Sequence, residues 1–241
     1  MSDFARYSRQ VVLREVGVNG QQLLRDSSVL IVGLGGLGSI AAPYLAAAGI
    51  GELVLADRDH VEVSNLQRQT LYRQADVGRR KTEAAHAQLQ ALNPETRYRL
   101  CDGESWPRAV SEVDVVLDCT DNFPARHAIN RACVAARKLL VSGAAIRFEG
   151  QLAVFDLQRG GACYHCLYPE AGAAAETCEE AGILGPVVGT IGAMQALAAL
   201  QLLLGLDAGA GRLQVWDALR GQWRSHKIAL DPHCTVCGTP R

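Results

Sequence analysis

The chain has 241 residues, of which 49% are hydrophobic and 20% are charged, and its formal net charge is -1 at pH 7. This length suits one α/β domain with a full-sized core, and the balanced charge excludes a bulk attraction to nucleic acid or to an acidic membrane surface. No secretory signal is visible at the start, so we expect a cytoplasmic protein.

Residues 1–25 predict a helical N-terminal arm, and residues 26–145 alternate between apolar strands and helices. That alternation is typical of a Rossmann-like, doubly wound and mostly parallel sheet. The first strand ends in a glycine turn, residues 33–38, whose backbone N–H groups can approach a phosphate closely around Gly36. Asp57 follows the second strand, where a carboxylate can bind ribose hydroxyls. Taken alone, this pattern most often indicates a dinucleotide dehydrogenase.

A loop rich in hydrogen-bond donors follows Asp57. It contains Ser64, Asn65, Leu66, Gln67 and Arg68, and Lys81 comes soon after it. A hydride-transfer enzyme has little use for so many phosphate donors, whereas an enzyme that breaks a triphosphate must neutralise its charge with Arg and Lys. A solvated polar loop is the alternative interpretation.

Asp121 and Asn122 stand between an apolar strand, residues 113–120, and a helix that begins near Phe123. Because parallel strands share one ligand crevice at their carboxyl ends, Asp121 should face the same pocket as Gly36. A carboxylate beside a polyphosphate suits Mg²⁺, but Asp and Asn are also common helix N-caps. One of the two residues could do each job.

Residues 146–241 predict an extension with antiparallel strands near residues 151–156, 212–217 and 223–229. Two Cys-x-x-Cys pairs bracket these strands: Cys163 with Cys166, and Cys234 with Cys237. Four thiolates form a closed tetrahedral shell for a structural Zn²⁺, with redox pairs or disulfides as alternatives. His165 lies between two ligands and is expected to be a bystander. The zinc would tie the C-terminal tail to the middle of the chain.

The apolar run at residues 187–205 approaches the length of a membrane span. Gln195, Gln201 and two interior glycines favour a buried helix or a dimer face instead. The small-residue tracts at residues 171–175 and 208–211 are expected to be loops.

Four cysteines lie outside the zinc pairs. Cys101, Cys119 and Cys133 have apolar neighbours, so we expect buried thiols there. Cys178 differs because it lies in a polar stretch beside Glu179 and Glu180. Those carboxylates would raise the pKa of the Cys178 thiol and reduce its nucleophilicity.

In order and spacing, these motifs resemble the bacterial E1-like adenylyltransferases called MoeB, ThiF and HesA, which are relatives of ubiquitin-activating enzymes. The matching segments are residues 6–10, 33–38, 64–69, 118–122, 142–145, 163–166 and 234–237. Each match is weak alone, but their order is specific. The resemblance implies one E1-like domain over residues 1–241, with residues 146–241 as a zinc-bearing, carrier-binding extension.

The activity that the resemblance implies is ATP-dependent adenylylation of the C-terminal glycine of a small ubiquitin-like sulfur-carrier protein of the MoaD or ThiS type. The products would be an acyl-AMP and pyrophosphate, and the activated end would become a thiocarboxylate for molybdopterin, thiamin or a related product. The carrier would end in Gly-Gly, and a separate protein would donate the sulfur. Arg147, Glu149 and the strand at residues 151–155 are candidate walls of the channel for its tail.

The resemblance also assigns roles to residues by position. The ATP contacts would be Gly36, Asp57, Ser64, Asn65, Leu66, Gln67, Arg68, Lys81, Asp121 and Asn122, with Mg²⁺ beside Asp121. Arg9 would reach the ATP of a partner subunit, which makes a homodimer the expected unit. Cys178 matches a thiol that joins the carrier covalently in ThiF-like members and is not required in MoeB-like members.

Two other functions remain open at this stage. An NAD-dependent oxidoreductase with a structural zinc would use the same glycine turn, but it gives no reason for Arg68, Lys81 and Asp121 to converge. A non-catalytic nucleotide-binding scaffold predicts a damaged site, whereas each matched ATP position holds the residue type of the family.

Overall fold

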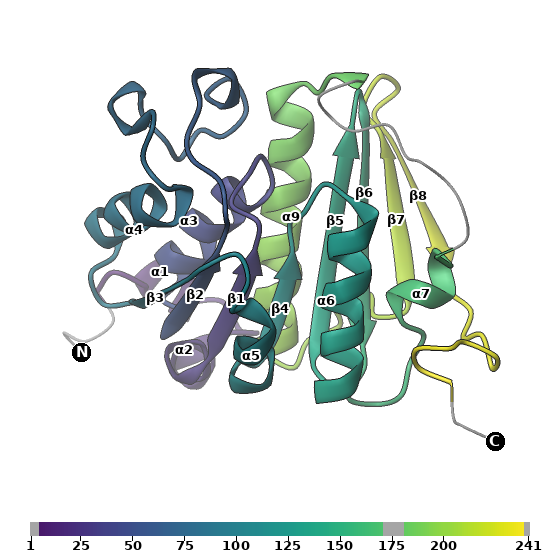
Figure 1. Cartoon of the computed structure of the whole chain (residues 1–241). Helices are drawn as coiled ribbons and strands as arrows, with labels where there is room; N and C mark the ends of the chain where they lie inside the picture. The colour runs from purple at the N-terminus through teal and green to yellow at the C-terminus, as the bar shows by residue number, and fades with distance from the viewer. Residues whose placement is uncertain (1–4, 171–180, 239–241) are drawn as a thin grey trace.

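The computed structural model describes residues 5–170 and 181–238, which form one sheet with helices on both faces (Figure 1). In spatial order, the eight strands are β3 (Arg97–Cys101), β2 (Glu52–Ala56), β1 (Ser28–Val32), β4 (Val115–Asp118), β5 (Leu139–Ile146), β6 (Glu149–Asp156), β7 (Arg212–Asp217) and β8 (Gln222–Lys227). The first five are parallel and the last three join antiparallel. The predicted doubly wound fold is confirmed, and its antiparallel strands continue the same sheet.

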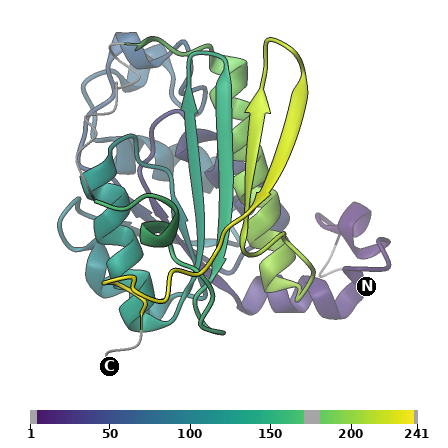
Figure 2. The same cartoon turned by 90° about the vertical axis from the view of Figure 1, so that its right-hand side faces the viewer.

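Two helical layers cover the central strands β1, β2 and β4, which are apolar on both faces, whereas β8 is exposed along its length. One layer contains α3 (Gly38–Ala48), α4 (Lys81–Leu92) and α9 (Gly185–Leu203), and the other contains α5 (Trp106–Ala109), α6 (Phe123–Ala136) and α7 (Tyr164–Leu167). Successive strand residues alternate between them: Val29 and Ile31 pack toward α3, whereas Leu30 and Val32 pack toward α6. Figure 2 shows the two layers from the edge.

Close packing within the chain explains most glycines of the turn after β1. Gly33 has a φ of +93°, and a Cβ there would lie 2.7 Å from the carbonyl oxygen of Cys119. A Cβ on Gly36 would lie 2.9 Å from the Val188 side chain in α9. Gly35 alone has room, with the nearest heavy atom 3.7 Å away. This packing requirement at Gly33 and Gly36 adds to the predicted reason for glycine, which is that a side chain would keep a phosphate away from the turn.

Helix α9 packs lengthwise on β4, β5 and β6 (Figure 1). Its buried Gln195 donates through Nε2 to the carbonyl oxygens of Asp118 at 2.8 Å and Val141 at 3.3 Å, and its Oε1 accepts from the Cys119 thiol at 3.5 Å. Among the described residues, α9 is the one helix with the length and composition to cross a membrane, and 44% of that stretch is buried within the protein. These contacts support the expected buried helix.

The N-terminal arm consists of α1 (Ser8–Val11) and α2 (Gly17–Asp26). Gln10 and Gln21 both donate to the carbonyl oxygen of Ala48, at the end of α3, and Tyr7 accepts a hydrogen bond from Asn93 at the end of α4. Crossover helices end at the amino edge of a parallel sheet, so the arm lies at the edge opposite the carboxyl ends of the strands. In Figure 1, α2 is accordingly at the bottom.

Candidate functional site

The glycine turn and the end of β2 are locked together at the carboxyl edge of the sheet. The Oδ2 atom of Asp57 accepts from the backbone N–H of Leu34 at 2.6 Å, and its Oδ1 accepts from the N–H of Asp59 at 2.8 Å. The Tyr72 hydroxyl donates to the Leu34 carbonyl at 2.8 Å. Leu34 is therefore held from both sides of its peptide, which fixes the Asp57 carboxylate beside the turn.

Lys81 supplies a buried cation at this edge. It is the first residue of α4, and only 7% of its side chain is exposed. Its Nζ lies 3.3 Å from Oδ2 of Asp59, and its backbone N–H donates to the Asp59 carbonyl. Burial raises the pKa of Asp57, while the Lys81 charge and two backbone N–H groups act against that rise. An ammonium group held in this way is a suitable point charge for a phosphate.

The polar loop after β2 contains a short 3-10 helix, η2 (Val63–Asn65), and hydrogen bonds largely to itself. Ser64 donates to the Glu62 carboxylate at 3.2 Å, and the buried Asn65 accepts from the Glu62 N–H at 3.2 Å. The half-buried Arg68 donates to the Ser64 carbonyl at 3.0 Å. Gln67 is exposed, and Leu66 packs against the core. Because Asn65 Oδ1 bonds within the loop, its predicted role at the nucleotide would be carried by Nδ2, which has two N–H donors and lies 3.5 Å from Ser64 Oγ.

After β4, the two neighbouring residues divide their tasks. Asn122 is the N-cap of α6, since its Oδ1 accepts from the Ala125 N–H at 2.9 Å, and its Nδ2 donates to Asp121 Oδ1 at 3.2 Å. Asp121 is exposed. The carboxylate of Asp121 is therefore free of the capping role and accessible at the carboxyl edge.

Asp118 is a functional candidate that sequence reasoning did not assign. Its side chain is 1% exposed, and it accepts from the Thr120 hydroxyl at 2.7 Å and from Ser142 Oγ at 2.8 Å. The sequence signal was a carboxylate at the end of an apolar strand, inside a recognised motif. Its contacts show that it braces the loop that carries Asp121.

Two further polar side chains near the turn are buried, and each has one polar atom that finds no hydrogen-bond partner among the described residues. They are Ser39, through Oγ, in the first turn of α3, and Gln69, through Oε1. Gln69 lies next to the glycine turn, with its Nε2 the nearest atom to a Cβ built on Gly35. Buried groups without partners need an explanation, and a bound molecule is one. Gln69 belonged to the polar run in the sequence, whereas nothing marked Ser39.

The four predicted zinc ligands converge. The sulfur atoms of Cys163, Cys166, Cys234 and Cys237 all lie within 4.8 Å of one another, with Cys163 to Cys234 at 3.8 Å and Cys166 to Cys237 at 3.4 Å. A tetrahedron with Zn–S bonds of about 2.3 Å has edges of about 3.8 Å, so the donor set and spacing fit a structural Zn²⁺. His165 is a neighbour, with Nδ1 3.5 Å from the Cys234 sulfur.

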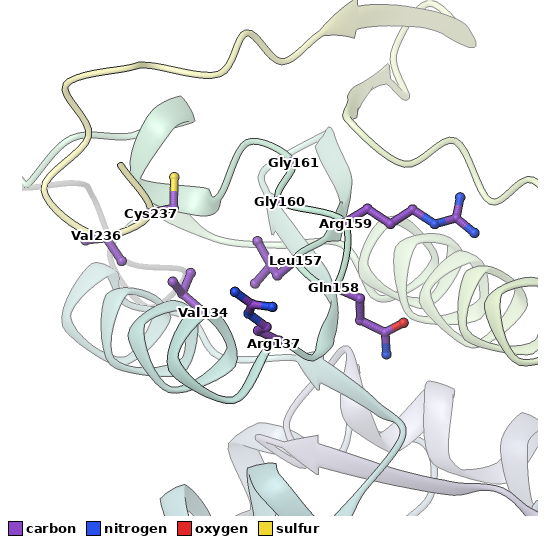
Figure 3. A pocket seen from close by; sticks show the side chains of 9 residues that line it. All are labelled: Val134, Arg137, Leu157, Gln158, Arg159, Gly160, Gly161, Val236 and Cys237. Atoms are coloured by element: carbon purple, nitrogen blue, oxygen red, sulfur yellow. The ribbon is translucent and has the colours of Figure 1, made fainter. Parts of the chain in front are cut away.

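A cavity of about 440 Å³ lies elsewhere, between the end of α6, the segment after β6 and the second cysteine pair (Figure 3). Arg137, Leu157 and Val236 are among its lining residues. Arg159 also lines it but pairs with Asp156 at 3.4 Å. This cavity is not at the carboxyl edge, so it is separate from the predicted nucleotide site.

The remaining predicted residues lie apart from this edge or beyond what is described. Arg9 is exposed on α1, at the opposite edge of the sheet. Cys178, with Glu179 and Glu180, lies outside the described residues, as does the tract at 171–175. Arg147 bonds through its backbone N–H to the Gly182 carbonyl at 2.9 Å, which joins the β5–β6 turn to the segment before α9.

Comparison with known proteins gives a consistent result. The model of the ThiF family matches residues 7–236. Two Escherichia coli proteins are each 47% identical over 98% of this chain: one is named "Sulfur carrier protein ThiS adenylyltransferase", with 96% of its length covered, and the other "Molybdopterin-synthase adenylyltransferase", with 97% covered. "Adenylyltransferase and sulfurtransferase MOCS3" of Drosophila virilis is 48% identical, but the chain covers only 54% of it.

The fold also matches solved structures. A crystal structure of Escherichia coli MccB superimposes with a TM-score of 0.84 over 99% of this chain and 74% of that one. Its sequence is 23% identical, so this likeness supports the fold alone.

Proposed function

Because the chain belongs to the ThiF family, we propose that it uses ATP to adenylylate the C-terminal glycine of a small ubiquitin-like sulfur-carrier protein ending in Gly-Gly. The observation that carries this proposal is the 47% identity, over nearly the full length of both chains, to two proteins named as adenylyltransferases. An NAD-dependent oxidoreductase is not favoured, since neither relative is named as one.

The chemistry requires alignment and charge neutralisation rather than a base. The carrier's terminal carboxylate is ionised at neutral pH, so it can attack the α-phosphorus of ATP directly. A new oxygen–phosphorus bond forms, the bond between the α-phosphorus and its bridging oxygen to the β-phosphate breaks, and pyrophosphate leaves with the electron pair. Acceleration then comes from holding the two reactants in line and from stabilising the developing negative charge.

We assign that task to residues at the carboxyl edge. Lys81 and Arg68 would neutralise phosphate charge, and the buried, hydrogen-bonded Asp57 would bind the ribose hydroxyls. Asp121 fits a Mg²⁺ because it is an exposed carboxylate freed from the capping role by Asn122. A bound Mg²⁺ would supply further neutralisation of the phosphates.

The cysteine cluster has a structural role in this proposal. Four thiolates leave no open coordination position, which suits a structural Zn²⁺ rather than a catalytic one. It would tie the chain after β8 to α7 and its N-cap residue, Cys163. We place no chemical step there.

A homodimer is part of the proposal because of where the N-terminal arm lies. Gln10 and Gln21 fasten the arm to the amino edge of the sheet, opposite Lys81 and Asp121. Arg9 would therefore contact the ATP of another subunit, as the family resemblance implies. We propose that this unit acts in the cytoplasm and receives sulfur from a separate protein.

The pathway depends on the carrier. Both molybdopterin and thiamin relatives are 47% identical to this chain, so identity does not favour either route. We propose that the acyl adenylate forms without Cys178, because the attack on ATP requires no thiol.

The test is exchange of labelled pyrophosphate into ATP, with purified zinc-loaded protein and a panel of ThiS-type, MoaD-type and other carriers ending in Gly-Gly. Exchange with one intact carrier, and none with the same carrier lacking its last glycine, is the expected result and names the pathway. Lack of exchange with every carrier, from protein that binds ATP, would favour the non-catalytic scaffold.

A further inference from the structure

A buried socket at the amino edge of the sheet holds Tyr7, two residues before Arg9. Tyr7 is only 4% exposed, and its ring lies against Gly49, which directly follows α3. A Cβ on Gly49 would lie 2.6 Å from two of the ring carbons, and the φ of Gly49 is +84°. Glycine therefore meets two requirements here, since it tolerates this φ and leaves room for the ring.

The Tyr7 hydroxyl is bonded on both sides within the socket. It accepts from Asn93 Nδ2 at 2.9 Å and donates to the Glu95 carboxylate at 3.1 Å. Asn93 directly follows α4 and is fully buried, and its Nδ2 also donates to the carbonyl of Ala46, near the end of α3. The Tyr7 side chain is thus fixed to the ends of two helices, α3 through Gly49 and α4 through Asn93.

The short helix α1, which carries Arg9, depends on this socket for its position. It has four residues, none of them buried, and a helix this short has little stability of its own. The Tyr7 carbonyl accepts from the N–H groups of Gln10 at 2.9 Å and Val11 at 3.0 Å, so the turn that contains Arg9 is bonded to Tyr7. Arg9 itself is exposed, and its side chain makes no hydrogen bond or ion pair within the described residues. A rigidly held turn thus presents an unpaired cation.

From these contacts, we infer that Tyr7 is a positioning residue that fixes Arg9 for contact with the ATP bound by a partner subunit. The helices that form its socket begin at the opposite edge of the sheet, α3 with Gly38 and α4 with Lys81, so the arm is fixed to the framework of its own subunit's site. An arginine on a fixed arm loses less conformational freedom when it binds a phosphate than one on a mobile arm. The inference rests on the proposed function, since it takes ATP as the group that Arg9 contacts across the dimer.

The test uses heterodimers of two full-length chains, isolated through a different affinity tag on each chain. The donor chain carries Lys81→Ala, which should disable its own site, and keeps Arg9. The acceptor chain carries Arg9→Ala and keeps Lys81, so its site can use only the Arg9 of the donor chain. Tyr7→Phe, which removes the hydroxyl and keeps the ring beside Gly49, is then placed in one chain or in the other.

With Tyr7→Phe in the donor chain, we expect equilibrium binding of Mg·ATP at the acceptor's site to weaken about three- to tenfold, the range that corresponds to one lost buried hydrogen bond. In the acceptor chain, the same substitution should change the Kd by less than about twofold, because that chain has no Arg9 to position. The matched control is Tyr98→Phe in the donor chain, whose hydroxyl donates to the carbonyls of Leu89 and Asn93 at the same end of α4. It should also leave the Kd within about twofold.

Equal weakening from both placements of Tyr7→Phe would reveal a general effect on the fold and overturn the inference. Normal binding with the substitution in the donor chain, an equal shift from Tyr98→Phe, or a chain that forms no dimer would also overturn it. Because the binding measurement needs no carrier, the two proposals fail separately. Weakening confined to the donor placement, without pyrophosphate exchange by the unaltered chain, would refute the adenylylation and keep the inference. Exchange by the unaltered chain without that weakening would do the opposite.

Discussion

Replacing Asp121 should separate activity from stability. Asp121 is exposed, and it accepts a hydrogen bond from Asn122 Nδ2 at 3.2 Å, while the cap of α6 is made by Asn122 rather than by Asp121. Asp121→Ala should therefore change the free energy of unfolding by no more than about 0.5 kcal/mol. Pyrophosphate exchange should fall by at least about a hundredfold, since one electrostatic contact to the reacting phosphates is typically worth that much.

Both quantities can be measured on one preparation. Urea unfolding gives the free energy of unfolding, metal analysis gives the zinc content, and carrier-dependent exchange of labelled pyrophosphate gives the activity. A matched control is Asp207→Ala, which removes another exposed carboxylate beyond the end of α9. Asp207 Oδ1 accepts a hydrogen bond from the Gly209 N–H at 2.8 Å. This variant should behave like the unaltered chain in all three assays.

Normal exchange by Asp121→Ala would refute the assigned role beside Mg²⁺. A fall of more than about 2 kcal/mol in the free energy of unfolding would refute the structural reasoning instead, because a surface carboxylate outside the cap should not contribute that much.

Four other substitutions test the remaining proposals. Arg9→Ala and Lys81→Ala chains should each lose pyrophosphate exchange. If Arg9 acts across a dimer, an equal mixture of the two variants should regain activity after random subunit exchange, because about a quarter of its sites then combine an intact Lys81 with an intact Arg9 from the partner. No recovery on mixing would place Arg9 outside the partner's site. Cys178→Ala should form the acyl adenylate at a normal rate, measured by exchange, and loss of exchange from a folded variant would show that the thiol is needed. Cys166→Ser should open the four-thiolate shell. Metal analysis should then show loss of zinc, and urea titration should show a free energy of unfolding lower by about 2 to 5 kcal/mol. Unchanged zinc content and unfolding free energy would contradict a structural metal.

The sheet was predictable because its signal is local. Apolar runs such as residues 28–32 and 52–56, separated by a glycine turn and helices, admit few arrangements other than parallel strands covered on both faces. The positions of Asp57 and Asp121 at the carboxyl edge follow from the same rule. The converging cysteines were predictable from their spacing alone.

Contacts between distant polar residues were not predictable. Asn130 reads in sequence as an ordinary polar residue of a helix, and only the fold brings the backbone N–H of Tyr164, 34 residues later, within 2.9 Å of its Oδ1. Gln69 and Ser39 are common residue types in a polar loop and a helix start, so their burial carries no local signal. The crowding at Gly36, where a Cβ would lie 2.9 Å from the Val188 side chain, was not predictable either, because Val188 belongs to a helix much later in the chain.

The buried amide of Gln195 also determines how α9 packs on the sheet. A helix face made of valine, isoleucine and alanine can pack on an apolar sheet in several rotations and registers of similar energy, because hydrophobic burial has little directional preference. Gln195 favours one of these arrangements. In that register its amide donates to the carbonyl oxygens of Asp118 and Val141, and in every other register the amide would be buried without hydrogen-bond partners. A Gln195→Leu chain would keep the apolar surface of α9 but lose the preference for one packing register. The ends of β4 and β5 beneath the helix would then no longer be fixed in a single position relative to α9.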